Sequence, residues 1–228
     1  MKAVIAVLTL LLSVHVAADL AAGRAAYLAG DYEAAFNEFE PLAEQGDSAA
    51  QFALATMYGA GQGVLQDDKE AFKWHNKAAE QGYADAQYVL GIMLQTGKGF
   101  PQDYKTAVKW YTKAAEQGSA DAQYNLAVMY RYGQGVPQDH KEAVKWFTEA
   151  AKQGNAKAQH NLGLMYALGD GVLQNNVYAH MWLNISSSNG TETSGKIRDL
   201  VAESMTPDQI AGAQRLAREC VKKNYKDC

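Results

Sequence analysis

A fixed repeat of 36 residues is the feature that most limits what this chain can fold into. Tryptophans mark it at Trp74, Trp110, Trp146 and Trp182. Single glycines, glutamines and paired glycines keep the same step: Gly46, Gly82, Gly118 and Gly154; Gln51, Gln87, Gln123 and Gln159; Gly61/Gly63, Gly97/Gly99, Gly133/Gly135 and Gly169/Gly171. A period of this length is typical of stacked supersecondary units, which bury their apolar faces only against one another.

Each repeat is predicted to form a helix–loop–helix hairpin. In the third repeat an apolar face at helical spacing predicts the first helix. Its members are Ala122, Leu126, Met129 and Tyr130. Gly133 and Gly135 are expected to end this helix, because glycine accepts the left-handed conformation that helix ends often need.

The second helix of the third repeat is marked by its start. Asp139 is expected to be the N-cap, and Glu142, three residues later, to complete a capping box. Trp146, with Ala143 and Ala150 on either side, is predicted to form the buried stripe of this helix. The tryptophan is therefore expected to fill space between hairpins rather than to bind a cofactor.

The two ends of the chain depart from the repeat, as the end units of a repeat array do. We predict a signal peptide at 1–18, a capping hairpin at 19–46 and a helical C-terminal cap at 191–228. The four repeats between them are 47–82, 83–118, 119–154 and 155–190.

The entry into the C-terminal cap is polar. The stretch from Ser186 to Gly195 is expected to be a loop that two further helices follow. Thr206 is the predicted N-cap of the second of these, with Pro207 as its first helical residue.

The order of motifs within one unit resembles the Sel1-like repeat, a relative of the tetratricopeptide repeat. These motifs are Ala-x-Ala-Gln, Leu-(Gly/Ala)-x-Met, Gly-x-Gly, (Asp/Asn)-x-x-x-Ala, Trp-aromatic and Ala-Ala-x-Gln-Gly. The resemblance implies an all-α fold, a right-handed α-solenoid with a concave face, and a role as adaptor or scaffold. The fourth repeat departs, with Asn175 for the capping Asp and Ser186-Ser187 for the Ala-Ala pair, so its last turn is expected to be looser.

Residues 1–18 have the pattern of a secretory signal: Lys2, an apolar stretch, and small residues ending at Ala18. The apolar stretch is too short to span a bilayer comfortably, so no stable membrane insertion is expected after cleavage behind Ala18. The protein is therefore predicted to be periplasmic or secreted. An uncleaved anchor or a buried first helix is the alternative.

Charge and motifs argue against several function classes. The net charge is −4 and no run of five basic residues occurs, so nucleic acid is not an expected partner. No catalytic or phosphate-binding motif is present. The histidines His75, His140, His160 and His180 fall at different positions of their repeats and form no metal-ligand pattern. We expect no enzymatic activity, no cofactor, no metal and a monomer.

Candidate partner-binding residues come from the first helix of each hairpin, which lines the concave surface in solenoids of this kind. Aligned repeats place Phe52, Tyr88, Tyr124 and His160 in one row, and Ala53, Val89, Asn125 and Asn161 in the next. From these rows and the nearby Arg131 the candidates are Tyr88, Tyr124, Asn125, Arg131, His160 and Asn161. Rings and amides suit a protein or peptide partner, because rings supply contact area and amides pair with a peptide backbone.

One resemblance bears on these rows. In related tetratricopeptide clamps an Asn binds the peptide backbone, and Asn125 and Asn161 match that position. The alternative is that this row is a solvated or partly packed helix face, whose aromatic residues only brace the next hairpin.

A second function class stays open. Some cysteine-rich Sel1-like proteins are associated with β-lactam binding and hydrolysis, and carry in each repeat a Cys pair separated by seven residues. This chain has that spacing once, at Cys220 and Cys228, outside the Trp-bearing repeats. In an oxidising compartment a disulfide is the default for such a pair. The alternative function is therefore binding or hydrolysis of a β-lactam or peptidoglycan-precursor ligand.

Overall fold

The computed structural model describes residues 20–97, 100–226 and 228, and the chain divides into two compact units, Met1–Gln102 and Asp103–Cys228. The first contains a helix at 20–28, α2 (Tyr32–Glu44), α3 (Ser48–Ala60), α4 (Asp68–Glu80) and α5 (Ala84–Thr96). The second contains α6 (Tyr104–Glu116), α7 (Ala120–Tyr132), α8 (His140–Lys152), α9 (Ala156–Leu168), α10 (Asn176–Ser188), α11 (Glu192–Ala202) and α12 (Pro207–Lys222).

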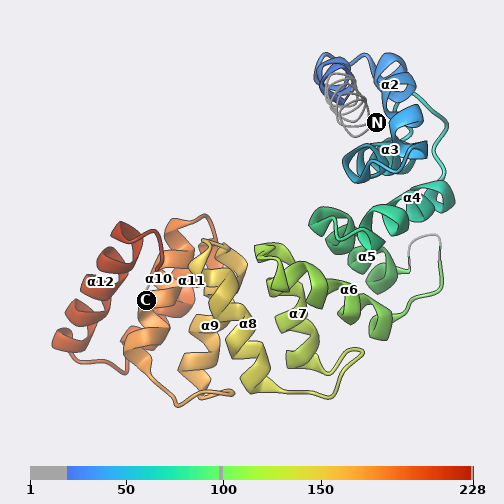
Figure 1. Cartoon of the computed structure of the whole chain (residues 1–228). Helices are drawn as coiled ribbons and strands as arrows, with labels where there is room; N and C mark the ends of the chain where they lie inside the picture. Colours follow the sequence, from blue (N-terminus) through green and yellow to red (C-terminus); the bar gives the residue numbers. More distant parts are fainter. Residues whose placement is uncertain (1–19, 98–99, 227) are drawn as a thin grey trace, which may run out of the picture. The chain divides into compact units, whose positions relative to one another are not determined.

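All regular structure in the described residues is helical (Figure 1), which confirms the predicted all-α class. The predicted signal at 1–18 lies outside the described residues.

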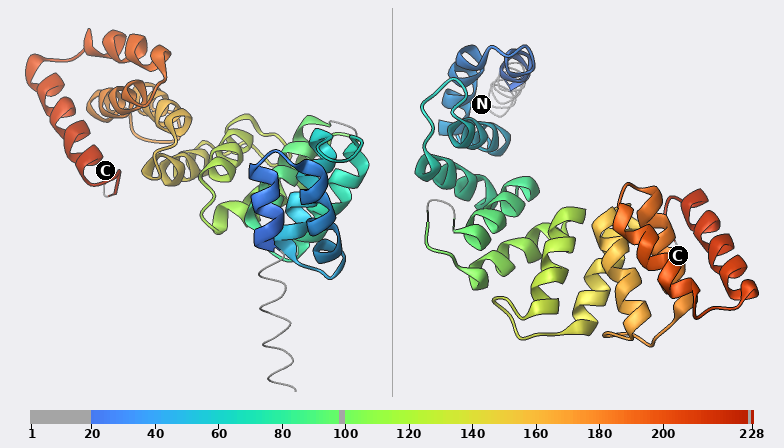
Figure 2. Two further views of the ribbon diagram at one scale, coloured as in Figure 1. Left: turned by 90° about the horizontal axis from the view of Figure 1, so that it is seen from above. Right: turned by 180° about the vertical axis from the view of Figure 1, so that it is seen from behind.

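Consecutive helices pack as hairpins within each unit (Figure 2). In the first unit α3 packs on α4, and α4 on α5; in the second, α8 lies between α7 and α9, and α10 packs on α9. Each repeat thus supplies a first and a second helix, as the sequence predicts. The second repeat supplies α5 to one unit and α6 to the other.

The two glycines of the loop in the third repeat have different functions. Gly133 ends α7 with a φ of 67°, and its N–H donates to the Met129 carbonyl, as predicted. Gly135, with a φ of 73°, does not end the helix: a Cβ there would lie 2.4 Å from the carbonyl carbon of Tyr104. The second glycine is therefore needed because the loop crosses the start of the preceding second helix.

The starts of the second helices are capped from one side only. Oδ1 of Asp139 accepts from the backbone N–H of Lys141 and Glu142, at 2.9 and 3.1 Å, which confirms the N-cap. The predicted capping box is wrong, because the Glu142 carboxylate binds Lys145 at 3.0 Å instead. A complete box forms at Thr206, the predicted N-cap of α12, whose partner is Gln209.

Ala143 and Ala150 of the predicted stripe are fully buried, but Phe147 takes the place predicted for Trp146. Phe147 is fully buried, whereas Trp146 is only half-buried and the ammonium of Lys145 lies 5.2 Å from its ring centroid. The lysine stem and charge cover the outer face of the ring. Trp74 and Trp182 are buried, at 7% and 2% exposure, so the prediction holds for those two repeats.

The polar stretch predicted as a loop is mostly helical. Helix α10 continues to Ser188 and α11 begins at Glu192. Ser186 and Ser194 are fully buried, with their Oγ atoms 2.9 Å apart, and Ser186 Oγ donates to the Ala156 carbonyl at 2.8 Å. Small hydroxyls that bind one another let α10 and α11 approach closely, and they tie down the turn that was expected to be looser.

The last helix turns back onto the fourth repeat. Helix α12 packs on α10 (Figures 1 and 2), over Met181 and Ile185, which are each 1% exposed. Cys220, at the end of α12, forms a disulfide with Cys228, as predicted for an oxidising compartment. Tyr225 lies between the two cysteines in the sequence. Its hydroxyl accepts a hydrogen bond from Asn189 Nδ2 at 3.1 Å, which attaches the C-terminal tail to the end of α10.

Candidate peptide-binding site

The glutamine present in every repeat determines which face of each first helix is buried and which positions remain available for binding. Its side-chain amide donates to the carbonyl of an alanine in the preceding second helix: Gln51 to Ala43 at 3.0 Å, Gln87 to Ala79 at 3.0 Å, Gln123 to Ala115 at 3.1 Å and Gln159 to Ala151 at 3.1 Å. This bond fixes the rotation of the first helix, because a buried amide without a partner is costly. The next two positions, the rows of the sequence prediction, are half-buried in every repeat.

In the first unit these positions line an apolar cavity of about 390 Å³ between helix 20–28 and α3. Its lining residues are Arg24, Tyr27, Leu28, Phe39, Phe52, Ala53 and Thr56. Gly23 lets the helix close over the cavity floor, since a Cβ there would lie 2.6 Å from the Phe39 ring.

Most polar groups of the cavity wall are already bonded within the protein. The Tyr27 hydroxyl donates to Gln62 Oε1 at 2.8 Å, and the Thr56 hydroxyl donates to the Phe52 carbonyl at 2.9 Å. Arg24 has no hydrogen bond or ion pair with any residue that the structure describes. A guanidinium group is thus left at the rim of an apolar hollow.

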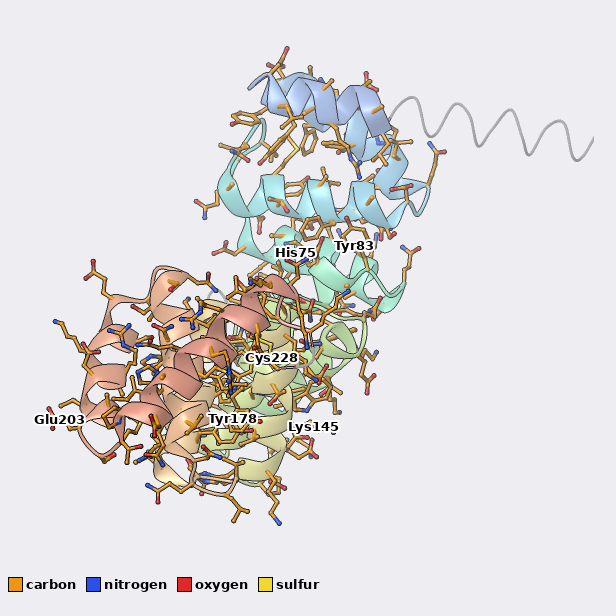
Figure 3. All side chains as sticks on the ribbon, turned by 90° about the vertical axis from the view of Figure 1, so that its left-hand side faces the viewer. His75, Tyr83, Lys145, Tyr178, Glu203 and Cys228 are labelled. Carbon is orange, nitrogen blue, oxygen red and sulfur yellow. A yellow bond between two sulfur atoms is a disulfide. The ribbon has the colours of Figure 1, made fainter. Side chains whose placement is uncertain are left out.

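Phe52 fits both interpretations of the aromatic row, namely partner binding and packing against the next hairpin. Its ring lies 5.3 Å from the His75 ring and 5.2 Å from the Tyr83 ring, centroid to centroid (Figure 3 labels His75 and Tyr83). It therefore packs against the next hairpin while also lining the cavity. Burial lowers the pKa of His75 to about 4, so this imidazole is neutral at pH 7.

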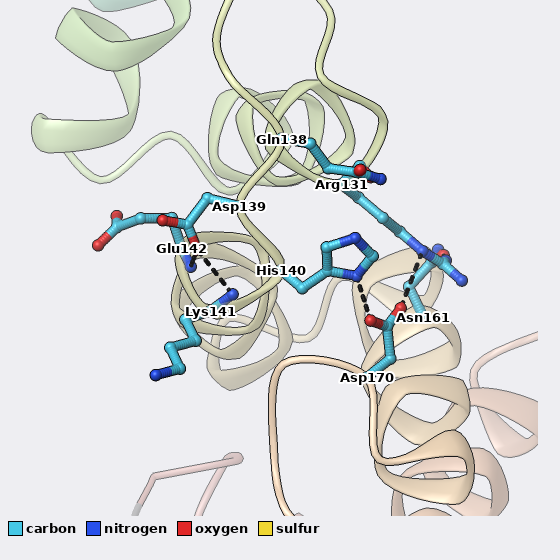
Figure 4. Close-up of polar contacts among 8 residues, drawn as sticks. All are labelled: Arg131, Gln138, Asp139, His140, Lys141, Glu142, Asn161 and Asp170. Atoms are coloured by element: carbon cyan, nitrogen blue, oxygen red, sulfur yellow. Dashed lines mark hydrogen bonds and ion pairs between the residues drawn. The ribbon is translucent and has the colours of Figure 1, made fainter.

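In the second unit two of the predicted residues, Arg131 and Asn161, bind each other. Arg131 Nη1 donates to Asn161 Oδ1 at 2.7 Å (Figure 4). Asn161 Nδ2 donates to the Lys157 carbonyl at 2.9 Å. Arg131 Nε also lies 3.9 Å from an oxygen of Asp170, whose other oxygen contacts Nδ1 of His140. The Arg131 side chain is 15% exposed, so this network ties α7 to α9 and to the start of α8.

Tyr124 joins the same group. Its ring lies 5.8 Å from the fully buried Phe147 ring, and burial raises the pKa of its hydroxyl, although a hydrogen bond to Asn161 opposes the shift. Tyr124, Arg131 and Asn161 are thus brought together by packing between repeats. Asn125 lies half-buried on α7, and Tyr88 lies half-buried on α5 in the first unit.

His160, the last candidate, belongs to a chain of hydroxyls. Its Nδ1 lies 2.8 Å from Ser194 Oγ, which lies 2.9 Å from Ser186 Oγ. Because Ser186 gives its one proton to the Ala156 carbonyl, Ser194 must donate to Ser186, and His160 must donate to Ser194. The imidazole therefore carries its proton on Nδ1 and does not act as a base toward Ser194. Burial first, and then the charge of Arg131, lower the pKa of His160.

The described part of the chain contains neither a metal-ligand cluster nor a membrane-spanning helix. No three His, Cys, Asp or Glu side chains in it lie close enough to hold a metal ion together. No described helix has the length and apolar character needed to cross a membrane.

The repeats match the family model of the Sel1 repeat four times, at residues 48–83, 84–119, 120–155 and 156–191. The chain belongs to the Sel1 repeat family. Each match begins one residue later than the repeat that the sequence analysis outlines. Sel1 repeats typically mediate protein–protein interaction.

Two solved structures are similar to this Sel1 repeat chain. A Sel1 repeat protein from Oxalobacter formigenes is 40% identical, with a TM-score of 0.69, over 75% of this chain and 50% of its own. The protective antigen c5321 of uropathogenic Escherichia coli strains, which displays an SLR fold, is 27% identical, with a TM-score of 0.58, over 91% of this chain and 54% of its own. The chain thus spans about half the length of these relatives and shares their all-α repeat solenoid fold. No curated protein matches the chain at a significant level.

The cavity was not predicted from the sequence, although two positions indicate it. Where later repeats have Val89, Asn125 and Asn161, the first has Ala53; where they have Ile92, Val128 and Leu164, it has Thr56. The first repeat therefore has its smallest side chains at two positions about one turn apart on α3, and that is where the hollow forms. The contribution of helix 20–28 to it has no counterpart in the repeat pattern.

Proposed function

We propose that this chain is an exported scaffold or adaptor that binds a protein or peptide through the first helices of its hairpins. The observation that carries the proposal is the apolar cavity between helix 20–28 and α3. Concave apolar sites with few polar groups are typical of binding sites, and burying one Leu or Phe side chain contributes about 1.5–3 kcal/mol.

Binding without catalysis also fits the polar groups around His160, one of the predicted residues of the second unit. The Ser194 hydroxyl is fully buried and its proton is directed to Ser186, away from His160. Those groups hold helices together and leave no exposed nucleophile beside a base. We propose export to the periplasm or the outside of the cell, cleavage after Ala18 and a monomeric state as parts of the same function.

Peptide selection tests the proposal. Peptides selected from a random displayed library on the purified protein are expected to bind it, and the variant Thr56→Leu is expected to weaken them about tenfold or more. Leucine is the residue that the fourth repeat has at this position, Leu164, so it fills the cavity with a side chain that the fold accepts. Affinities are measured by isothermal titration calorimetry.

Thr148→Leu is the matched control, because the Thr148 hydroxyl makes the same bond to a carbonyl four residues earlier, on a second helix. If no peptide is selected, or if both variants weaken binding equally, the cavity is not the binding site. Hydrolysis of nitrocefin by the protein would instead favour the β-lactam alternative.

A further inference from the structure

We propose that the cavity of the first unit binds an acidic peptide segment, with an apolar side chain inside it and a neighbouring carboxylate on Arg24. This inference rests on the proposed function and adds the chemistry of the partner. The charge of the cavity rim and the shape of its wall carry it.

The lining of the cavity carries one positive charge, which no acidic side chain of the lining neutralises. Arg24 is the one charged residue among the seven that line the cavity, and no described residue pairs with it. The hydroxyls of Tyr27 and Thr56, which line the same hollow, are used within the protein. A ligand therefore meets apolar surface and one cation, and a carboxylate is the group that a guanidinium binds through two parallel hydrogen bonds.

The apolar part has room for one or two side chains. Its volume of about 390 Å³ is near the lower end of the range for small-ligand sites, about 300–1,000 Å³. Leu28, which is 86% exposed, extends the apolar wall beyond the hollow. Covering such an exposed apolar side chain with a partner stabilises the complex.

The spacing of the wall residues favours a peptide. Arg24 and Leu28 lie one helical turn apart on helix 20–28, and Phe52 and Thr56 lie one turn apart on α3. Two helices that present residues at this spacing fit a segment whose acidic and apolar side chains alternate along one face, as in helix-in-groove recognition.

Two synthetic peptides that differ only in charge test the inference: acetyl-SEELFEES-amide and acetyl-SKKLFKKS-amide, titrated into the purified protein by isothermal titration calorimetry. We expect the wild type to bind the acidic peptide about fivefold more tightly than the basic one, and the preference to shrink as salt is added. Arg24→Glu is expected to reverse the preference.

Arg215→Glu, an equal charge change on the exposed face of α12, is the control and is expected to leave the preference unchanged. The inference is overturned if the wild type shows no charge preference, if both reversals act alike, or if laurate binds more tightly than the acidic peptide. When Thr56→Leu still abolishes binding but Arg24→Glu has no effect, only the charge assignment fails. When neither variant matters, the proposed site fails as well.

Discussion

The residue after each repeat tryptophan is the centre of its hairpin. Phe147 and Tyr111 are fully buried there, and His75 takes the same place in the first repeat at 4% exposure. Nδ1 of His75 has no hydrogen-bond partner among the described residues. An imidazole held neutral in this way makes the unfolding free energy depend on pH, because the unfolded chain binds a proton that the folded chain refuses.

The first prediction concerns His75. Its pKa falls from 6.5 in the unfolded chain to about 4 in the folded one, so its contribution is intact above pH 6.5 and is lost as pH falls toward 4. The expected loss is up to about 3 kcal/mol. His75→Phe, with the residue of the third repeat, should make the unfolding free energy flatter with pH in urea titrations between pH 7 and pH 4.5.

Some acid sensitivity should remain in that variant, because burial also lowers the pKa of His160 and of His180. If wild type and His75→Phe lose the same free energy of unfolding over this range, His75 is not the cause.

At the scale of elements, helix α12 packs on two apolar residues of the fourth repeat, at positions where the earlier repeats have polar residues. At the position of Met181 the earlier repeats have Lys73, Lys109 and Lys145, and at that of Ile185 they have Lys77, Lys113 and Glu149. These polar residues are solvated or cover tryptophan rings, as Lys77 does at 3.9 Å from the Trp74 centroid. The change to apolar residues in the fourth repeat marks where another helix covers the second helix.

The second prediction follows from this exchange. The double variant Met181→Lys/Ile185→Lys restores lysine at both positions and is expected to release α12, at a cost of about 2–5 kcal/mol. Hydrogen exchange should show α12 amides losing protection while those of α7 and α8 keep theirs. Lys109→Met at the equivalent position of α6 is the control and should change no helix. Retained protection of α12 in the double variant would contradict this account.

At the scale of the whole molecule, the chain forms two compact units, each with its own buried cluster. In the first, Phe39, Leu54 and Trp74 lie at the centre; in the second, Phe147 and Trp182 are joined by Cys220 of the last helix. The buried cysteine and its disulfide connect the stability of the C-terminal cap to the compartment in which the protein folds.

The third prediction concerns export. Protein recovered from the periplasm of a Gram-negative host is expected to begin at Asp19 and to carry no free thiol, as read by N-terminal sequencing and by intact mass after iodoacetamide. Ala18→Tyr puts a bulky residue at the cleavage site and should block processing. A product that begins at Met1, or that is alkylated at both Cys220 and Cys228, would refute the prediction.

The sequence alone determined the repeated elements, because their signals are local. The period of 36 residues, the glycine after each first helix and the Asp or Asn before each second helix act within a few residues of the chain. They therefore predict the hairpins, with the N-cap at Asp139 and the helix end at Gly133 as examples. The helices around Ser186 were not predicted, because the partners of its hydroxyl lie more than a few residues away in the sequence. They are Ser194 Oγ and a carbonyl of another helix.

Only the tertiary structure decided what the half-buried rows of the first helices do. Arg131 and Asn161 are 30 residues apart and bind each other, whereas Arg24 and Ala53 lie across an open hollow. The sequence places Ala53 and Asn161 in the same row of the first helices. Whether such a face is filled or free depends on the volumes and partners that distant helices bring to it, which no local pattern records.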